Sequence, residues 1–111
     1  MRSITVGGNL TANTETTVYT VPTGYYAKWN LMYLLNGTGS TKHMTVIWRD
    51  ASASTDIYIL NQYTVNSKEF LKMDGGAYMV LEAGDTIKMT SETGSTFSYI
   101  CTFEVENKEG I

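Results

Sequence analysis

The stretch from Tyr25 to Leu35, YYAKWNLMYLL, decides the expected fold, because apolar residues recur in it at every second position. Positions 25, 27, 29, 31, 33 and 35 form one alternate set that is apolar throughout, and the other set becomes apolar towards its end. An apolar period of two with aromatic residues is typical of a strand with one face in the core. Since both faces become apolar, we expect this strand to be covered on both sides, as a central strand is.

A helix is the competing interpretation of this stretch, because Leu31, Leu34 and Leu35 also fit helical spacing. The Thr-rich, Gly-punctuated neighbours favour a strand instead, as does the sequence Gly37-Thr38-Gly39 that follows. Working outward, short β-type segments recur at roughly ten-residue spacing with turn residues between them. We therefore predict an all-β, single-domain antiparallel β-sandwich over residues 1–111, with jelly-roll or Greek-key connections and about eight strands.

A strand is expected near each end of the chain. Ser3 to Val6 is expected to form the first strand, which Gly7-Gly8-Asn9 would break or bulge. The last strand alternates most cleanly, with Phe97, Cys101 and Phe103 on its apolar face. Together with the other inward positions, these residues give the expected core: Trp29, Leu31, Val46, Trp48, Ile87, Phe97 and Phe103.

Composition excludes several classes of protein. The net charge of −3 and an isoelectric point near 5.0 give no electrostatic basis for binding nucleic acid or anionic lipid. Cys101 is the single cysteine, so there is no intrachain disulfide and no thiolate metal cage. The N-terminal residues lack an apolar signal segment, and the longest apolar run, Leu31 to Leu35, is too short to span a bilayer. We expect no nucleic-acid partner, no membrane and synthesis in a cytoplasm.

Catalytic chemistry is sparse in the sequence. The single histidine, His43, is interpreted as a surface or hydrogen-bonded residue, and Cys101 as a buried structural thiol. The carboxylates that follow or precede strands are assigned to turns, where they bond the backbone: Asp50, Asp56, Asp74, Glu82 and Asp85. A glycosidase pair among them stays open, because sequence spacing does not place two carboxylates face to face. We expect no enzyme activity, no catalytic residues, no metal site and no cofactor.

Aromatic residues are the most distinctive feature that remains. Three interpretations stay open: ordinary half-buried strand residues, an exposed platform for sugar rings, and a subunit interface, where Tyr, Phe and Met are enriched. The candidate interface residues are Tyr25, Tyr26, Tyr58, Tyr63, Phe70 and Tyr78.

Two blocks of the sequence combine turn and strand residues: Thr17-Val18-Tyr19-Thr20-Val21-Pro22-Thr23-Gly24, followed at once by the long apolar strand, and Leu81-Glu82-Ala83-Gly84-Asp85-Thr86-Ile87-Lys88. In these blocks the sequence resembles the small all-β structural proteins of tailed-bacteriophage virions. The resemblance extends from about Thr16 to Val105 as a pattern of turns and strands. Members of this group have no shared catalytic motif, so no functional residue carries over. The side chains of Tyr25 and Tyr26, which follow Gly24, are bulkier than those that members of the group carry at these positions.

The resemblance implies a non-enzymatic virion structural protein. The leading expectation is a capsid decoration (cement) protein that binds the phage shell and self-associates, with a trimer as the implied symmetry. The alternatives are a small tail, neck or fibre component of the virion and a sugar-binding β-sandwich module. The implied partners are phage capsid or tail proteins and further copies of the chain.

Overall fold

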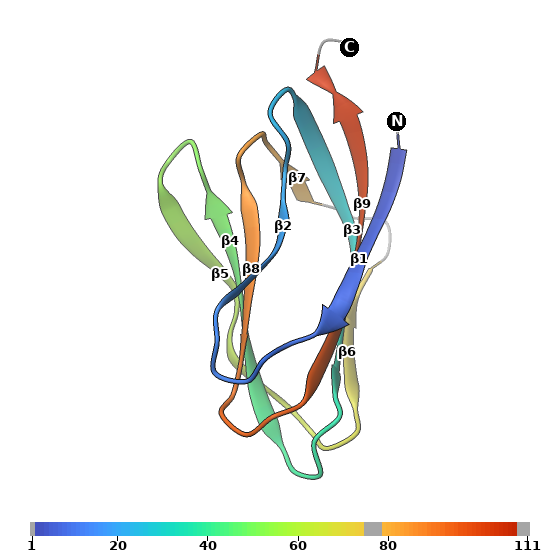
Figure 1. Cartoon of the computed structure of the whole chain (residues 1–111), viewed down its shortest axis with the longest axis vertical. Helices are drawn as coiled ribbons and strands as arrows, with labels where there is room; N and C mark the ends of the chain where they lie inside the picture. The colour runs from blue at the N-terminus through green and yellow to red at the C-terminus, as the bar shows by residue number, and fades with distance from the viewer. Residues whose placement is uncertain (1, 75–78, 109–111) are drawn as a thin grey trace.

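The computed structural model describes residues 2–74 and 79–108. In this part of the chain there are nine strands, and no helix is long and apolar enough to cross a membrane. The strands form two antiparallel sheets that pack face to face, which confirms the predicted β-sandwich (Figure 1). The strands are β1 (Arg2–Asn9), β2 (Thr16–Thr20), β3 (Tyr25–Asn36), β4 (Lys42–Asp50), β5 (Thr55–Val65), β6 (Phe70–Met73), β7 (Met79–Leu81), β8 (Thr86–Ser91) and β9 (Phe97–Asn107).

The strand order is that of a jelly roll. One sheet has the order β1-β9-β3-β6, with β7 also paired to β3, and the other has the order β2-β8-β4-β5. β7 pairs with residues 27–29 of β3 and β6 with residues 32–35, so the two short strands follow one another along the same edge. Counted as one interrupted strand, they give the orders 1-8-3-6 and 2-7-4-5, in which the chain crosses repeatedly between the sheets, as in double-sheet jelly rolls.

A bulge in β3 changes which residues face the core. The register between β3 and β9 shifts between Trp29 and Leu31, so the inward positions are Ala27 and Trp29 before the shift and Met32 and Leu34 after it. The expectation that Leu31 is a core residue is therefore wrong: it is half-exposed on the outer face of the sheet. Among the described residues, only the inner face of this strand packs against the other sheet, so the expected double coverage is not found there.

The other predicted core residues lie inside. Trp29, Val46, Ile87, Phe97 and Phe103 are buried, and Trp48 is half-buried against the same cluster. The last strand has the facing that its alternation predicted, with Phe97, Cys101, Phe103 and Val105 buried in the core.

The first strand is longer than expected. Residues 7–9 do not break it, because Gly7, Gly8 and Asn9 continue the pairing opposite Ile100, Tyr99 and Ser98 of β9. Pairing to β9 along its whole length thus secures the N-terminal strand within one chain.

An aromatic column joins the two sheets. The ring of Tyr19, from β2, stacks on Phe103 with centroids 4.2 Å apart, and Phe103 in turn lies 6.1 Å from Trp29. Such pairs add about 0.5–1.5 kcal/mol each beyond the apolar area that they bury.

A buried carboxylate fixes the end of the sandwich that carries the β7–β8 turn. Asp85 accepts hydrogen bonds from the indole Nε1 of Trp48 (3.1 Å) and from the backbone nitrogens of Ala51 (3.0 Å) and Glu82 (3.0 Å). Gly84, at the third position of the turn Glu82–Asp85, has a φ of 88°, a conformation that glycine adopts without steric cost. The assignment of Asp85 to backbone hydrogen bonding in a turn is confirmed.

Replacing Phe103 by Ala tests the packing of the column. Phe103 is fully buried between Tyr19 and Trp29, so we expect Phe103→Ala to lower the free energy of unfolding by about 3–5 kcal/mol. Ile100 lies on the same strand but on the outer face, so Ile100→Ala should cost less than about 1 kcal/mol. Urea titration of both variants measures the difference, and equal costs would contradict the assigned facing of β9.

Candidate interaction surface

The single histidine and the single cysteine of the chain occupy structural positions. The backbone nitrogen of His43 donates to Oε1 of Glu92 (2.9 Å), and its Nε2 lies 3.6 Å from the same oxygen. The backbone nitrogen of Glu92 donates in turn to the carbonyl of His43 (3.1 Å). This exchange ties the start of β4 to the turn after β8, which is a structural use of both residues.

Cys101 lies inside the core. Its side chain is fully buried, and this burial raises the pKa of the thiol from 9.0 to about 12, with a smaller opposing contribution from Trp29. A thiol with so high a pKa is almost entirely protonated near neutral pH, whereas attack and metal binding require the thiolate.

The assignment of Asp50 and Asp56 to turns is wrong, because Asp50 ends β4 and Asp56 lies within β5. Asp50, Asp56 and Asp74 each bond a side chain rather than serving one shared site. Asp56 pairs with Arg49 (3.2 Å), Asp74 pairs with Lys72 (3.3 Å), and Asp50 accepts a hydrogen bond from the hydroxyl of Ser52. Within residues 2–74 and 79–108, no group of three or more His, Cys, Asp or Glu side chains is placed to hold a metal ion.

Large apolar side chains are exposed mainly on one side of the sandwich. Among the described residues, seven such side chains are exposed, and six of them lie on the edge strands β5, β6 and β7. We call this side, bounded by β5 in one sheet and by β6 and β7 in the other, the open side. The six exposed residues are Ile57, Tyr58 and Tyr63 on β5, Phe70 and Met73 on β6, and Val80 on β7.

A second apolar surface adjoins the open side on the outer face of the β1-β9-β3-β6 sheet. Tyr33 of β3 lies directly opposite Ile100 of β9, and Leu35 lies opposite Phe70 of β6. The rings of Tyr33 and Phe70 stack with centroids 5.3 Å apart. With Leu31, these residues form what we call the outer patch: Leu31, Tyr33, Leu35, Phe70 and Ile100.

The outer patch explains the sequence of β3. This strand is apolar on both faces, but within one chain only the inner face meets the opposite sheet. An antiparallel sheet with a solvated face normally carries polar residues there. The apolar outer face is therefore suited to contact with another molecule.

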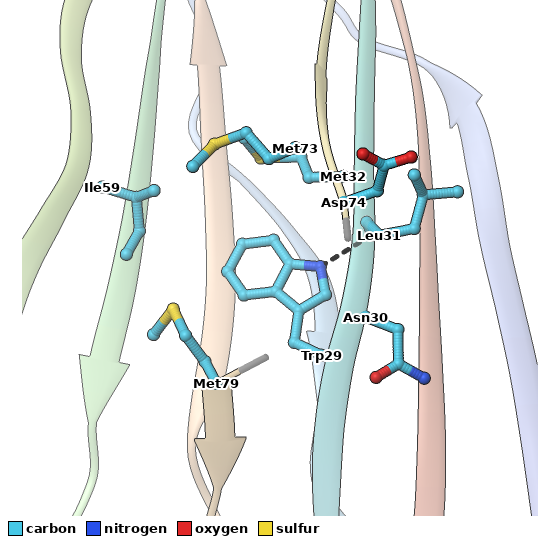
Figure 2. A pocket seen from close by; sticks show the side chains of 8 residues that line it. All are labelled: Trp29, Asn30, Leu31, Met32, Ile59, Met73, Asp74 and Met79. Carbon is cyan, nitrogen blue, oxygen red and sulfur yellow. Dashed lines mark hydrogen bonds between the residues drawn. The ribbon is translucent and has the colours of Figure 1, made fainter. Parts of the chain in front are cut away.

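A cavity of about 240 Å³ lies between the sheets at the open side. Figure 2 shows its centre, where the Trp29 indole projects towards Ile59 of β5, with Met73 and Met79 on either side of the ring. The indole Nε1 donates to the carbonyl of Leu31 (2.9 Å), so this polar atom is already satisfied. The interior is thus mostly apolar and adaptable, because methionine side chains are flexible. The remaining lining residues are Asn30, Leu31, Met32 and Asp74.

The predicted interface tyrosines and Phe70 separate into two groups. Tyr58, Tyr63 and Phe70 are exposed on the open side. Tyr25 packs against the core, and Tyr26 donates its hydroxyl hydrogen to Glu106 of β9. Tyr78 lies outside the described residues.

The sequence interpretation missed several members of these surfaces. The missed residues are Ile57, Met73, Val80 and Ile100, together with Leu31, Tyr33 and Leu35 of the outer patch. The two apolar faces of β3 were the available signal for the outer patch.

Comparisons with protein-family models and with curated proteins found no match to this chain.

The buried thiol predicts a specific pH dependence. Above pH 9.0 the thiol of Cys101 ionises in the unfolded chain but stays protonated in the folded chain up to about pH 12. The contribution of Cys101 to stability is therefore fully present below pH 9 and declines as the pH rises towards 12. Between pH 8 and pH 10.5 it should fall by roughly 2 kcal/mol.

Urea unfolding of the wild type and of Cys101→Ala at both pH values isolates this effect from other titrating groups. The difference in unfolding free energy between the two proteins should shift by that amount in favour of the variant. An unchanged difference would mean that the folded chain ionises Cys101 as readily as the unfolded chain does.

Proposed function

We propose that the protein is a non-enzymatic structural protein of a tailed-phage virion, and specifically a capsid decoration protein that binds the phage shell and associates with further copies of itself. It is made in the host cytoplasm and acts on the virion. The jelly-roll sandwich supports this proposal, as do the two sequence blocks that resemble virion structural proteins, Thr17–Gly24 and Leu81–Lys88. A trimer is the symmetry that the resemblance implies.

The outer patch carries the proposal. Its five side chains cover adjacent positions on β3, β6 and β9, and a polar surface would be expected there in a protein that acts alone. Covering such a patch by the flat surface of a shell removes apolar area from water at roughly 25 cal/mol per Å². Each contact can be modest, because many copies act on one particle.

A sugar-binding role is the second candidate, and the Tyr33–Phe70 pair favours it. The two rings stack at the surface, with Phe70 exposed and the ammonium-bearing Lys72 on the next outward position of β6. An exposed aromatic face of this kind can pack against a pyranose ring. A tail, neck or fibre component would use the same patch and differ in its position on the particle.

The proposal predicts that a charge in the outer patch abolishes shell binding. Virus particles assembled without the protein should be intact but less resistant to heat or low salt, and added wild-type protein should bind them and restore resistance. Ile100→Lys places an ammonium at the centre of the contact, so we expect at least tenfold weaker binding, about 1.4 kcal/mol or more. Co-sedimentation with particles measures the binding.

Thr20→Lys is the matched control, since Thr20 is exposed on β2 of the other sheet and should tolerate the same charge. Particles that are equally robust without the protein, and that do not bind it, would contradict the decoration role. Retention of the wild type on a polysaccharide column, lost in Phe70→Ala, would favour the sugar-binding candidate instead.

A further inference from the structure

β1 ends the β1-β9-β3-β6 sheet, and among the described residues no strand pairs with its second edge. Residues 75–78, which the structure does not describe, join β6 to β7, and both of these strands pair with β3 on its far side from β9. Lys108 donates its backbone nitrogen to the carbonyl of Gly24 (2.9 Å), on the side of β9 that faces β3. The second edge of β1 is thus at the opposite margin of the sheet from these segments, and we call it the free edge.

The free edge presents the backbone groups of alternate residues of β1. The nitrogen of Leu10 donates to the carbonyl of Phe97 (2.9 Å), which continues the register between β1 and β9 by one residue. In an antiparallel ladder, successive residues direct their backbone groups to opposite edges of the strand. Because this register is unbroken, the even-numbered residues of β1 bond β9. The odd-numbered residues direct their N–H and C=O groups to the free edge: Ser3, Thr5, Gly7 and Asn9.

β1 lacks the features that protect the other edge strands from pairing. Exposed edges are normally protected by bulges, proline, lysine or a very short length. The pairings of β2 and β5 contain register shifts, and β6 and β7 have four and three residues. β1 has eight residues in unbroken register, without proline or lysine, and its single charged residue is Arg2 at one end. Within residues 2–74 and 79–108, it is therefore the edge strand best suited to adding a further strand.

The sequence of β1 is complementary to itself about Val6. Residues 3–5, Ser-Ile-Thr, precede Val6, and residues 7–9, Gly-Gly-Asn, follow it. If a second copy runs antiparallel with Val6 opposite Val6, each glycine faces a β-branched residue of the other copy and the two outermost polar residues face each other. The facing pairs are Ser3 with Asn9, Ile4 with Gly8 and Thr5 with Gly7. This register pairs the backbone groups of all four residues that point to the free edge.

Gly8 has no steric requirement within one chain. Its φ is not positive, and a Cβ there would make only ordinary contacts with the Tyr99 ring, at 3.5 Å. Gly7 differs, because a Cβ at that position would lie 3.0 Å from the carbonyl oxygen of Tyr99. A glycine inside a strand weakens it, and such glycines often mark the close approach of another backbone. In the two-fold register, Ile4 of the second copy lies opposite Gly8, where the strand carries no side chain of its own.

We propose that two copies of this chain pair through the free edges of β1, about a two-fold axis at Val6 that is perpendicular to the sheet. The pairing joins the two β1-β9-β3-β6 sheets into one continuous antiparallel sheet. The contact rests on the self-association that is part of the proposed function, and it forms in solution without a shell. It is two-fold, so by itself it does not close the trimer that the sequence resemblance implies.

A second copy accounts for the free edge better than an unrelated strand does. An unrelated strand would cover β1 but would bring a free edge of its own, to which further strands could add. In the two-fold pair each β1 covers the other, so the contact is complete with two copies. The register also keeps like charges apart, because Arg2 of one copy falls opposite the apolar Leu10 of the other.

Proline at position 5 tests the free edge. Thr5→Pro removes an N–H that points to the second copy but keeps the bonds between β1 and β9, since proline is tolerated where the N–H of an edge strand faces solvent. We expect this variant to dissociate at least tenfold more readily than the wild type in sedimentation equilibrium. Thr5→Val is the matched control, because it keeps the N–H and the branched shape and should dimerise as the wild type does. Thermal melts of both variants establish that they fold.

A cysteine at the axis tests the register. The two copies of residue 6 form a pair without hydrogen bonds between them, so their Cα atoms lie about 4.5 Å apart, within the range that a disulfide spans. Val6→Cys should therefore yield a disulfide-linked dimer on non-reducing gels, with glutathione disulfide as the oxidant of the two thiols. The background is Cys101→Ala, because Cys101 lies opposite residue 6 in the same chain. Ser3→Cys in this background is the control, since its two copies would lie about 20 Å apart along the strands.

Three outcomes overturn the pairing through β1: a wild type that stays monomeric at several hundred micromolar, Thr5→Pro that dimerises as the wild type does, or Val6→Cys that cross-links no better than Ser3→Cys. All three are measured without virus particles. A monomeric wild type that binds particles would refute this contact alone. A cross-linked dimer that does not bind particles would refute the shell-binding role alone.

Discussion

The aromatic column formed by Tyr19, Phe103 and Trp29 is the contact on which the rest of the sandwich depends. It crosses from β2 to β9 to β3, so one set of stacked rings fixes the separation of the two sheets. Its last member has a second role, because the Trp29 indole is also the wall of the cavity at the open side. The packing of the core and the lining of this cavity therefore share the Trp29 side chain.

The sequence predicted the facing of a strand correctly where one face carries apolar side chains and the other carries polar ones. In β9, large apolar residues alternate with Ser, Thr and Glu, so the facing of Phe97 and Phe103 followed directly. In β3 the same reasoning failed after Trp29. Leu31 and Met32 are both apolar, and a bulge that exchanges their faces leaves no mark in the hydrophobic pattern. The break expected at Gly7 and Gly8 is not found for a related reason. Residue types that favour turns can continue a strand when a partner strand supplies the hydrogen bonds, as β9 does here.

The candidate surfaces were predictable to different degrees. The outer patch is implied by the two apolar faces of β3, a local property that can be read from eleven consecutive residues. The open side depends instead on which strands end each sheet, and pairing between segments far apart in the chain decides this. No local pattern indicates that Ile59 and Met73 lie across one cavity. The named tyrosines also divide according to strand facing, which placed Tyr25 against the core and Tyr58 in solvent.

The pairing of β1 with β9 has a consequence for how the protein is synthesised. Of the described strands, the first to be translated has its hydrogen-bonding partner in the last, with Arg2 opposite Val105, and these two residues lie at the end of the sandwich where Figure 1 marks the termini. The β1-β9-β3 arrangement cannot be completed until nearly the whole chain has been translated, and such non-local pairing slows folding. Until then, the apolar residues of both faces of β3 are in water together. A chain of this topology spends its most aggregation-prone interval as a nascent polypeptide.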